Sequence, residues 1–393
     1  MKYNFDEVVD RRHTNSIKWD NGPGLMASGL TDRFDGDTIP AFVADMDFRT
    51  AQPVIDAMVR TAEHGVYGYT SETTDPAYHQ AVIDWFARRR GWEIRPEEIL
   101  YVNGTVNALS KAVKAFSAPG EGVIIMRPVY APFTRVVEQA GRKVLNCRLR
   151  NDHGYYTIDY ALLEQLASAE DARMLIFCSP HNPVGRVWTR QELQQVAEIC
   201  RKHQVLMVAD EIHGDLVRVG QEFVPMAVAA GEDGLITCTA ANKTFNLAGL
   251  QATNVIVKDP QLRERLRTEI GEVLPTPFGV NALIAAYNEG EEWLEQLRVY
   301  LDGTIDETLA FLKERMPQVV CRRPEGTYIL WLDFRAYGLP QEELHERIYH
   351  RANVVWEPGT VFDPEEGEGF ERVCIPARRA LIREMFERVA REF

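Results

Sequence analysis

Short apolar runs alternate with amphipathic segments through the middle of the chain. The apolar runs predict strands, and the segments between several of them place apolar residues at helical spacing. Strands that are apolar throughout, with helices between them, predict a mostly parallel sheet covered on both faces, so the expected fold class is α/β. The predicted strands are 99–102, 123–126, 143–149, 174–178, 206–209, 235–239 and 254–257, and the helices among them include 106–116, 132–140, 160–167 and 190–203.

The two ends of the chain differ from this middle part. Residues 1–45 are rich in Asp and Gly and lack a long periodic segment, which predicts an arm lying on the rest of the protein. We expect a large domain at 46–287 and a small α+β domain made of 288–393 together with the arm. The further expected helices are 53–64, 78–90, 280–300, 304–314, 342–351 and 381–391, and the further expected strands are 319–321, 328–332 and 354–356.

Composition and charge narrow the possible partners. The 393 residues are 45% hydrophobic and carry a net charge of −14, with no basic surface that would neutralise nucleic-acid phosphates or anionic lipid. The six cysteines are scattered without a C-x-x-C pair, which is typical of thiols in a reducing compartment. The first residues lack the apolar core of a signal peptide, and no apolar run approaches the ~20 residues of a membrane helix. We therefore expect a cytoplasmic protein without nucleic-acid or membrane partners.

Residues of distinctive chemistry follow four of the predicted strands. Open parallel sheets bind ligands at the carboxyl ends of their strands, so these residues are expected at one edge. Taken singly, each has an ordinary interpretation as a surface lysine, a turn-forming asparagine or a helix-capping group. They are Asn182 after strand 174–178, Asp210 after 206–209, Lys243 after 235–239, and Gly104-Thr105-Val106, which opens a helix after 99–102.

Together these groups match the needs of pyridoxal 5′-phosphate (PLP). Its aldehyde condenses with a lysine amine such as that of Lys243, and its phosphate needs N–H donors such as those of the helix start. Its phenolate oxygen needs a donor such as the Asn182 amide, and its pyridine nitrogen needs a carboxylate such as Asp210. Tyr130, which also follows a predicted strand, can lie against the ring face.

Two other kinds of site are disfavoured. Gly22, Gly24 and Gly29 do not have the G-x-G-x-x-G spacing of a dinucleotide site, and no strand precedes them. His345 and His350 lie five residues apart, which places them off one helical face and disfavours a zinc site. We expect no metal.

Eight segments resemble the fold-type-I PLP enzymes of the aminotransferase superfamily, and more narrowly the MalY/PatB branch of cystathionine β-lyases. The resemblance implies the aspartate aminotransferase-like fold and α,β-elimination from cystathionine or related cysteine S-conjugates, giving a thiol such as homocysteine, pyruvate and ammonia. The segments are T-N-S-I-K-W-D (14–20), V-A-D-M-D-F (43–48), H-G-V-Y-G-Y-T (64–70), P-H-N-P-V-G-R-V-W (180–188), D-E-I-H (210–213), K-T-F-N-L-A-G-L (243–250), P-E-G-T-Y (324–328) and W-L-D-F (331–334).

The resemblance also implies roles for individual residues. Tyr69 would reach the phosphate of a neighbouring subunit, which implies a homodimer. Arg379 would grip the substrate α-carboxylate, with Arg378 as the adjacent alternative. The departing sulfur would take its proton from Lys243 or from a tyrosine such as Tyr130. The remaining roles are Lys243 as the Schiff-base lysine and base, Asp210 on the pyridine nitrogen, Asn182 on the phenolate, Tyr130 on the ring face, and Gly104, Thr105, Val106 and Thr239 at the phosphate.

The chain departs from the family pattern beside two of these residues. Asn242 stands where a small hydroxyl residue is expected before the lysine, and Cys374, Pro376 and Ala377 alter the segment before Arg379. Two alternatives to the lyase remain. An aminotransferase shares every step up to the carbanion, and a regulator-binding protein on the same fold belongs to a different class.

Overall fold

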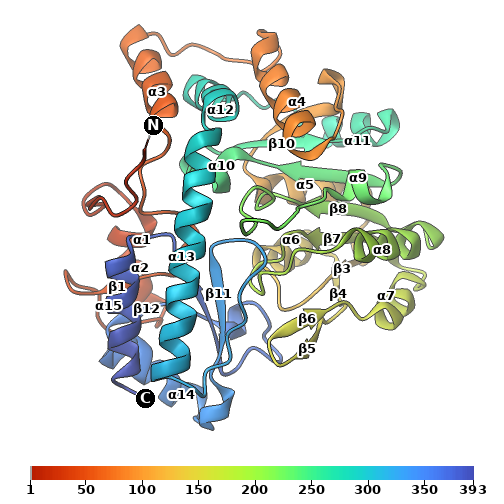
Figure 1. Ribbon diagram of the computed structural model, residues 1–393. Coiled ribbons are helices and arrows are strands. Elements are labelled where there is room, and N and C mark those ends of the chain that lie inside the picture. The colour runs from red at the N-terminus through yellow and green to blue at the C-terminus, as the bar shows by residue number, and fades with distance from the viewer. Residues whose placement is uncertain (1) are drawn as a thin grey trace.

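A seven-stranded sheet with helices on both faces forms the larger part of the protein (Figure 1). The computed structural model describes residues 2–393. The strand order is β2-β10-β9-β8-β7-β3-β4. The bounds are β2 Ile99–Asn103, β3 Gly122–Ile125, β4 Lys143–Asn146, β7 Ala172–Cys178, β8 Leu206–Asp210, β9 Leu235–Thr239 and β10 Ala252–Ile256.

One strand of this sheet runs against the others. β10 pairs antiparallel with both β2 and β9, whereas the remaining pairs are parallel, which confirms a mostly parallel α/β sheet. Because β10 reverses direction between them, β2 and β9 point the same way. The carboxyl ends of β2, β7, β8 and β9 therefore lie along one edge, where Cys178, Asp210 and Cys238 are in register.

Residues of each central strand alternate between two apolar cores. In β8, Met207 and Ala209 belong to one core, and Val208 between them belongs to the other. Both faces are covered, so every position can be apolar. The second core packs against α5 Thr105–Phe116, α6 Pro132–Gln139 and α11 Pro260–Ile270, and the first against α3 Gln52–His64, α4 Pro76–Arg90, α7 Tyr160–Ala167, α8 Arg190–Lys202, α9 Met226–Ala230 and α12 Pro277–Glu289.

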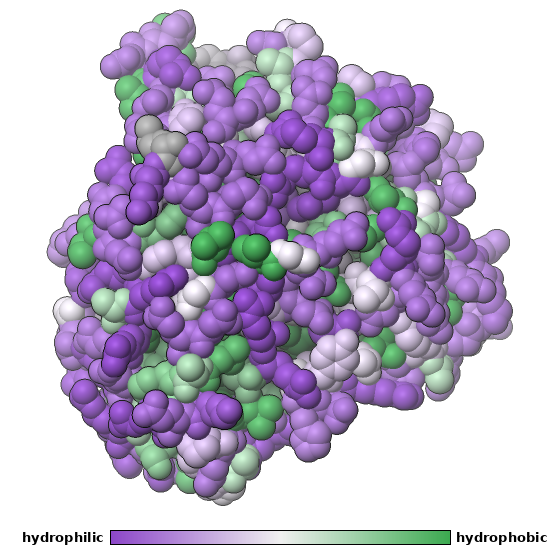
Figure 2. Space-filling model, viewed as in Figure 1, coloured by the Kyte–Doolittle hydropathy of each residue, from purple (hydrophilic) through white to green (hydrophobic). Residues whose placement is uncertain are grey.

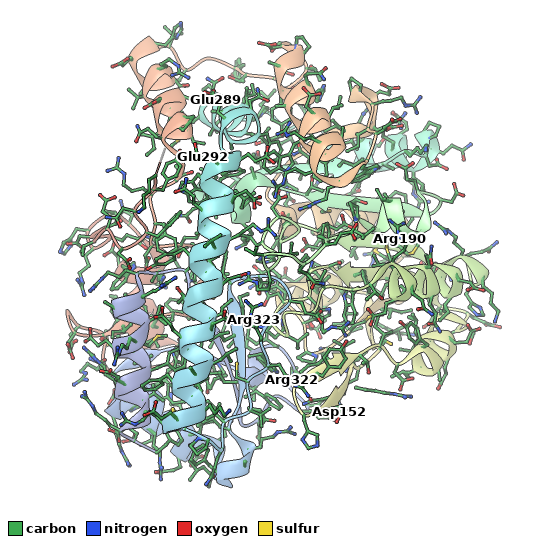
Figure 3. All side chains as sticks on the ribbon, in the orientation of Figure 1. Asp152, Arg190, Glu289, Glu292, Arg322 and Arg323 are labelled. Carbon is green, nitrogen blue, oxygen red and sulfur yellow. The ribbon has the colours of Figure 1, made fainter. Side chains whose placement is uncertain are left out.

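A long helix, α13 Glu291–Arg315, runs from the sheet to the small domain (Figure 1). The prediction of helices 280–300 and 304–314 is wrong, because the break lies at Gly290, where a Cβ would approach the Phe245 ring to 2.5 Å. Glu289 and Glu292 mark this junction in Figure 3. Gly303, between the two predicted helices, lies inside α13 against the Arg379 guanidinium.

The small domain has its own core, which joins Leu25, Ile39 and Ala41 to residues between 305 and 389. The N-terminal segment enters this domain because β1 pairs in parallel with β12. Strand 319–321 was predicted but forms only a bridge from Val320 to Asp333. The elements are α1 Ile17–Asp20, α2 Gly22–Ala27, β1 Ile39–Pro40, β11 Ile329–Asp333, α14 Gln341–His345, β12 Val354–Val355, β13 Glu357–Pro358, β14 Phe370–Cys374 and α15 Arg379–Ala390.

The surface is mostly polar. The face in Figure 2 is dominated by hydrophilic residues, with small separate apolar patches. Within residues 2–393, no helix combines the length and apolar character needed to cross a bilayer. The domain boundaries at 45/46 and 287/288 stay a prediction.

Candidate active site

Lys243 lies in a short helix, α10 Ala241–Thr244, directly after β9. Its Nζ donates a hydrogen bond of 2.7 Å to the carbonyl of Ala44. The N-terminal segment therefore contacts this lysine directly. Burial lowers the pKa of the Lys243 amine below its ordinary value, and the nearby Arg372 guanidinium acts in the same direction. A lysine held this way reaches its neutral, nucleophilic form more readily than a surface lysine does.

Asp210 ends β8, beside the strand that leads to Lys243. Its side chain is buried, and burial raises the pKa of its carboxyl to about 7. The Ile212 N–H, which donates to it at 3.3 Å, and the charge of Lys243 act in the opposite direction. A buried carboxylate with so few hydrogen bonds to offset its lost hydration is strongly stabilised by a cationic partner placed against it.

Asn182 and Tyr130 come from neighbouring loops that touch. The backbone N–H of Tyr130 donates to the Asn182 carbonyl at 3.1 Å. The side-chain Oδ1 of Asn182 is buried, and no atom of the described residues hydrogen-bonds to it. The Tyr130 ring meets Phe133 edge-on at 6.1 Å between centroids. Burial raises the pKa of the Tyr130 phenol, with Arg372 acting oppositely and Asp210 in the same direction.

The start of α5 forms the expected anion-binding end. Gly104 has φ +82°, and a Cβ there would meet the Gln251 side chain at 2.4 Å, so glycine is required. No side chain caps this helix, which leaves the first N–H groups of Thr105 and Val106 available to an anion. Thr105 Oγ1 lies 3.0 Å from Thr253 Oγ1.

Two more polar atoms around Lys243 are buried without partners. Thr239 Oγ1 and Asn242 Oδ1 have none in the described part of the chain. Buried polar groups are normally satisfied, so such a set at one edge indicates a polar ligand. The Lys243 amine and the buried Asp210 carboxyl fit the aldehyde and pyridine nitrogen of PLP, and the NH2 group of an amide such as Asn182 and the uncapped start of α5 fit its phenolate and phosphate.

Arg379, which is predicted to bind the substrate carboxylate, has its side-chain contacts on α13, and that role stays a prediction. Its guanidinium bonds to Glu307 at 2.9 Å, to Thr304 at 3.2 Å and to the Tyr300 carbonyl at 3.1 Å, all on α13. Arg378 instead lines a surface pocket of about 230 Å³ with the N-terminal arm.

Arg372 is the arginine that the sequence reasoning missed. It lies in β14 and is 3% exposed, and its charge lowers the pKa of Lys243 and acts on Tyr130. Its guanidinium donates to the Phe42 carbonyl, pairs with Glu357 and lies 4.8 Å from the Phe362 ring centroid. Its Nε is buried and has no partner within residues 2–393. One side of the Arg372 guanidinium is thus held by the protein, and its Nε–H remains free to donate to a ligand.

His213 ends the D-E-I-H segment that begins at Asp210. It is buried three residues after Asp210, and its Nδ1 has no partner within the described chain. Burial lowers the pKa of its imidazole well below the ordinary value, and Lys243 and Arg372 add to this effect. Its ring meets Tyr328 at 5.9 Å. Burial thus favours the neutral imidazole, whose Nδ1 has no hydrogen-bond partner in the described chain.

Comparisons with known proteins agree with this geometry. Residues 43–389 match the family described as aminotransferase class I and II. The chain belongs to this family. It is 39% identical over 393 residues to cystathionine beta-lyase PatB of Bacillus subtilis, with 98% of both chains covered.

Two solved structures of similar proteins share the fold of this aminotransferase-family chain. Cystalysin from Treponema denticola, which contains a pyridoxal 5′-phosphate cofactor, matches with a TM-score of 0.94 and 35% identity, over 100% of this chain and 99% of the other. A PLP-bound C-S lyase from Staphylococcus hominis matches with a TM-score of 0.93 and 30% identity, over 100% and 98%. The expected aspartate aminotransferase-like fold and the expected family are confirmed.

Proposed function

We propose that the protein is a PLP-dependent C–S β-lyase that cleaves cystathionine or related cysteine S-conjugates to a thiol, pyruvate and ammonia. The observation that carries this proposal is the meeting of Lys243, Asp210 and Asn182 at one sheet edge, where burial lowers the pKa of the lysine, raises that of the carboxyl and leaves Asn182 Oδ1 without a partner in the described chain. The 39% identity to a cystathionine beta-lyase over the whole chain supports the same activity.

The residues divide the work by their chemistry. Bound PLP supplies an electron sink that stabilises negative charge at the substrate α-carbon. Asp210 would keep the pyridine nitrogen protonated, and Asn182 would donate to the phenolate oxygen. Gly104, Thr105, Val106 and Thr239 would hold the phosphate, and Tyr130 would cover the ring. The Lys243 amine, whose pKa burial lowers, would take the α-proton.

Arg372 would bind the substrate α-carboxylate. It is a buried cation that acts on both Lys243 and Tyr130, so a carboxylate on it brings the α-carbon to the lysine. Glu357 lies directly opposite Arg372 in the β13–β14 pair and fixes the guanidinium from behind. A planar fork held this way is suited to a carboxylate.

The direct test is an assay without an acceptor for amino groups. We expect enzyme, PLP and cystathionine to release pyruvate and free thiol in equal amounts when no 2-oxo acid is present. Amino transfer to an added 2-oxo acid, with no pyruvate in its absence, would replace the lyase proposal with an aminotransferase.

A homodimer with shared sites belongs to this proposal. Tyr69 lies between α3 and α4 and is 97% exposed, which is unusual for a large aromatic residue. Val66 and Tyr67 beside it are also exposed, and Tyr67 contacts Phe278 across the gap to α12. A second copy that covers this surface would bury these side chains and could receive the Tyr69 hydroxyl at its phosphate.

Mixing two inactive variants tests the shared site. Tyr69→Phe is expected to weaken PLP binding about tenfold, because one charge-assisted hydrogen bond is lost. Mixed dimers of Tyr69→Ala with Lys243→Ala should regain activity, since one of the two sites then receives both native residues. Equal inactivity of the mixture, with dimers present by light scattering, would place Tyr69 in its own subunit's site.

The cytoplasmic location is part of the same proposal. All six cysteines are free thiols, and five of them are buried. Free thiols in this number are typical of a reducing compartment.

A further inference from the structure

One phenol shares a hydrogen-bond acceptor with Lys243. The Tyr328 hydroxyl donates to the Ala44 carbonyl at 2.8 Å, and Lys243 Nζ donates to the same oxygen at 2.7 Å. Because both atoms bond to the same Ala44 oxygen, the Tyr328 hydroxyl and Lys243 Nζ cannot be farther apart than the sum of these two distances. Tyr328 directly precedes β11 in the small domain, whereas Lys243 follows β9 in the large one, so the two meet only in the folded chain.

Tyr328 lies among the groups already assigned to the substrate. Its side chain is fully buried, and its ring meets His213. Burial raises the pKa of the Tyr328 phenol well above its ordinary value, and the Arg372 guanidinium acts in the opposite direction. The hydroxyl therefore keeps its proton at neutral pH, next to a guanidinium and an amine that can stabilise an oxyanion.

We propose that Tyr328 is the catalytic acid that protonates the departing sulfur, a role that rests on the β-elimination proposed above. As the Cβ–S bond breaks, its electron pair stays on sulfur, and sulfur takes the proton of the Tyr328 hydroxyl. Lys243, which carries the proton from the α-carbon, returns it to the Tyr328 oxygen. In net, one proton passes from the α-carbon to the thiol, no other reactant is consumed, and both residues regain their starting states.

The other candidate donors are less suited to this step. Lys243 carries the α-proton at that stage, and its neighbour Tyr328 offers that proton a short path to sulfur. Tyr130 packs its ring against Phe133 and is assigned to the cofactor face. Tyr328 is the phenol that shares an acceptor with the lysine amine.

The test compares leaving groups in Tyr328→Phe. We expect kcat for S-alkyl cysteines to fall about 100-fold, the usual contribution of one general acid. With 3-chloroalanine the loss should be under about threefold, because chloride leaves without a proton. Exchange of the α-proton of L-alanine in D2O, followed by NMR, should stay near the parent rate, since Lys243 performs that step.

Tyr156→Phe is the matched control. Tyr156 is another buried tyrosine, whose hydroxyl accepts one hydrogen bond from Trp331 Nε1 at 2.9 Å, and we expect its removal to have no dependence on the leaving group. An equal fall of Tyr328→Phe with both substrates, or slower α-proton exchange, would reduce Tyr328 to a structural role. If Tyr328→Phe loses the visible PLP spectrum, a fluorotyrosine at position 328 keeps the shape, and the rate with S-alkyl cysteines should follow the acidity of the phenol. A rate insensitive to that acidity overturns the proposal.

The same measurements distinguish a failure of the role proposed for Tyr328 from a failure of the proposed β-elimination. A parent enzyme that exchanges the α-proton but eliminates neither thiol nor chloride would overturn the β-elimination. A parent enzyme that eliminates both, with a Tyr328→Phe variant that does the same at unchanged relative rates, would overturn only the role of Tyr328.

Discussion

Replacing Lys243 with alanine is expected to lower kcat for elimination by roughly 10⁴-fold or more, because the cofactor link and the α-carbon base are lost together. The structure supports so large an effect, since this amine is buried and points to a single carbonyl, that of Ala44. The measurements are pyruvate release, α-proton exchange of L-alanine in D2O, and the visible spectrum after PLP is added.

Stability distinguishes loss of chemistry from loss of fold. Removing a buried amine whose pKa is already lowered relieves a desolvation cost, so the thermal midpoint of Lys243→Ala should fall little or rise. Lys111→Ala is the matched control, because it removes a half-buried lysine bonded to the Glu269 carbonyl at 2.8 Å, away from this edge. Borohydride should fix the cofactor to the parent and to Lys111→Ala. Covalent trapping in Lys243→Ala would show that another amine holds PLP.

The sheet and its functional edge could be predicted because local and global signals agree there. Each central strand is apolar on both faces, and its polar residue comes at the strand end, as with Asp210 after Ala209, or a few residues beyond it, as with Asn182 after Cys178. Because parallel strands have their carboxyl ends at the same edge of the sheet, these residues are predicted to lie together even when the loop conformations are unknown. Even β10, whose reversal was not predicted, leaves β2 pointing the same way as β9.

Arg372 was missed because its strand has no apolar pattern. β14 runs Phe-Glu-Arg-Val-Cys and is buried at all positions, although two adjacent residues are ionisable. Glu371 is tolerated because burial raises the pKa of its carboxyl to about 8 and it accepts a hydrogen bond from Tyr349 at 2.7 Å. Arg372 is tolerated because Glu357 faces it across the strands. Both side chains can be buried only because residues from distant segments pair with them. The composition of the strand does not reveal these partners.

The position of the N-terminal arm also depends on contacts between distant segments, which its composition does not reveal. Its turn-rich sequence predicts a covering segment but not which surface it covers. The structure ties it to the site through Asp47, which accepts from Lys18 at 2.8 Å, Trp19 at 2.9 Å and Arg11 at 2.8 Å. Burial alone would raise the pKa of this carboxyl, but its three donors hold it below the ordinary value. The arm thus fixes the segment whose Ala44 carbonyl receives both Lys243 and Tyr328.

The two arginines that could bind the substrate carboxylate are separated by a paired substitution. Arg372→Ala should lower kcat/KM for an S-alkyl cysteine about 100-fold, mainly through KM, because a charge-assisted fork is lost. Arg372→Lys keeps the charge without the fork and should lose about tenfold. Arg379→Ala, which gives up Glu307 and Thr304 on α13, should change kcat/KM less than about threefold.

A substrate without the carboxylate makes this comparison independent of folding. Arg372→Ala also leaves Glu357 buried without its cation, so some loss of thermal stability is expected. We therefore compare an S-alkyl cysteine with the corresponding decarboxylated amine by the rate of thiol release. The parent and Arg379→Ala should favour the amino acid strongly, whereas Arg372→Ala should lose most of that preference, because the discriminating contact is gone. If Arg379→Ala loses the preference and Arg372→Ala keeps it, the carboxylate is bound at the start of α15, and the fork in β14 serves only to hold Glu357 and the Phe42 carbonyl.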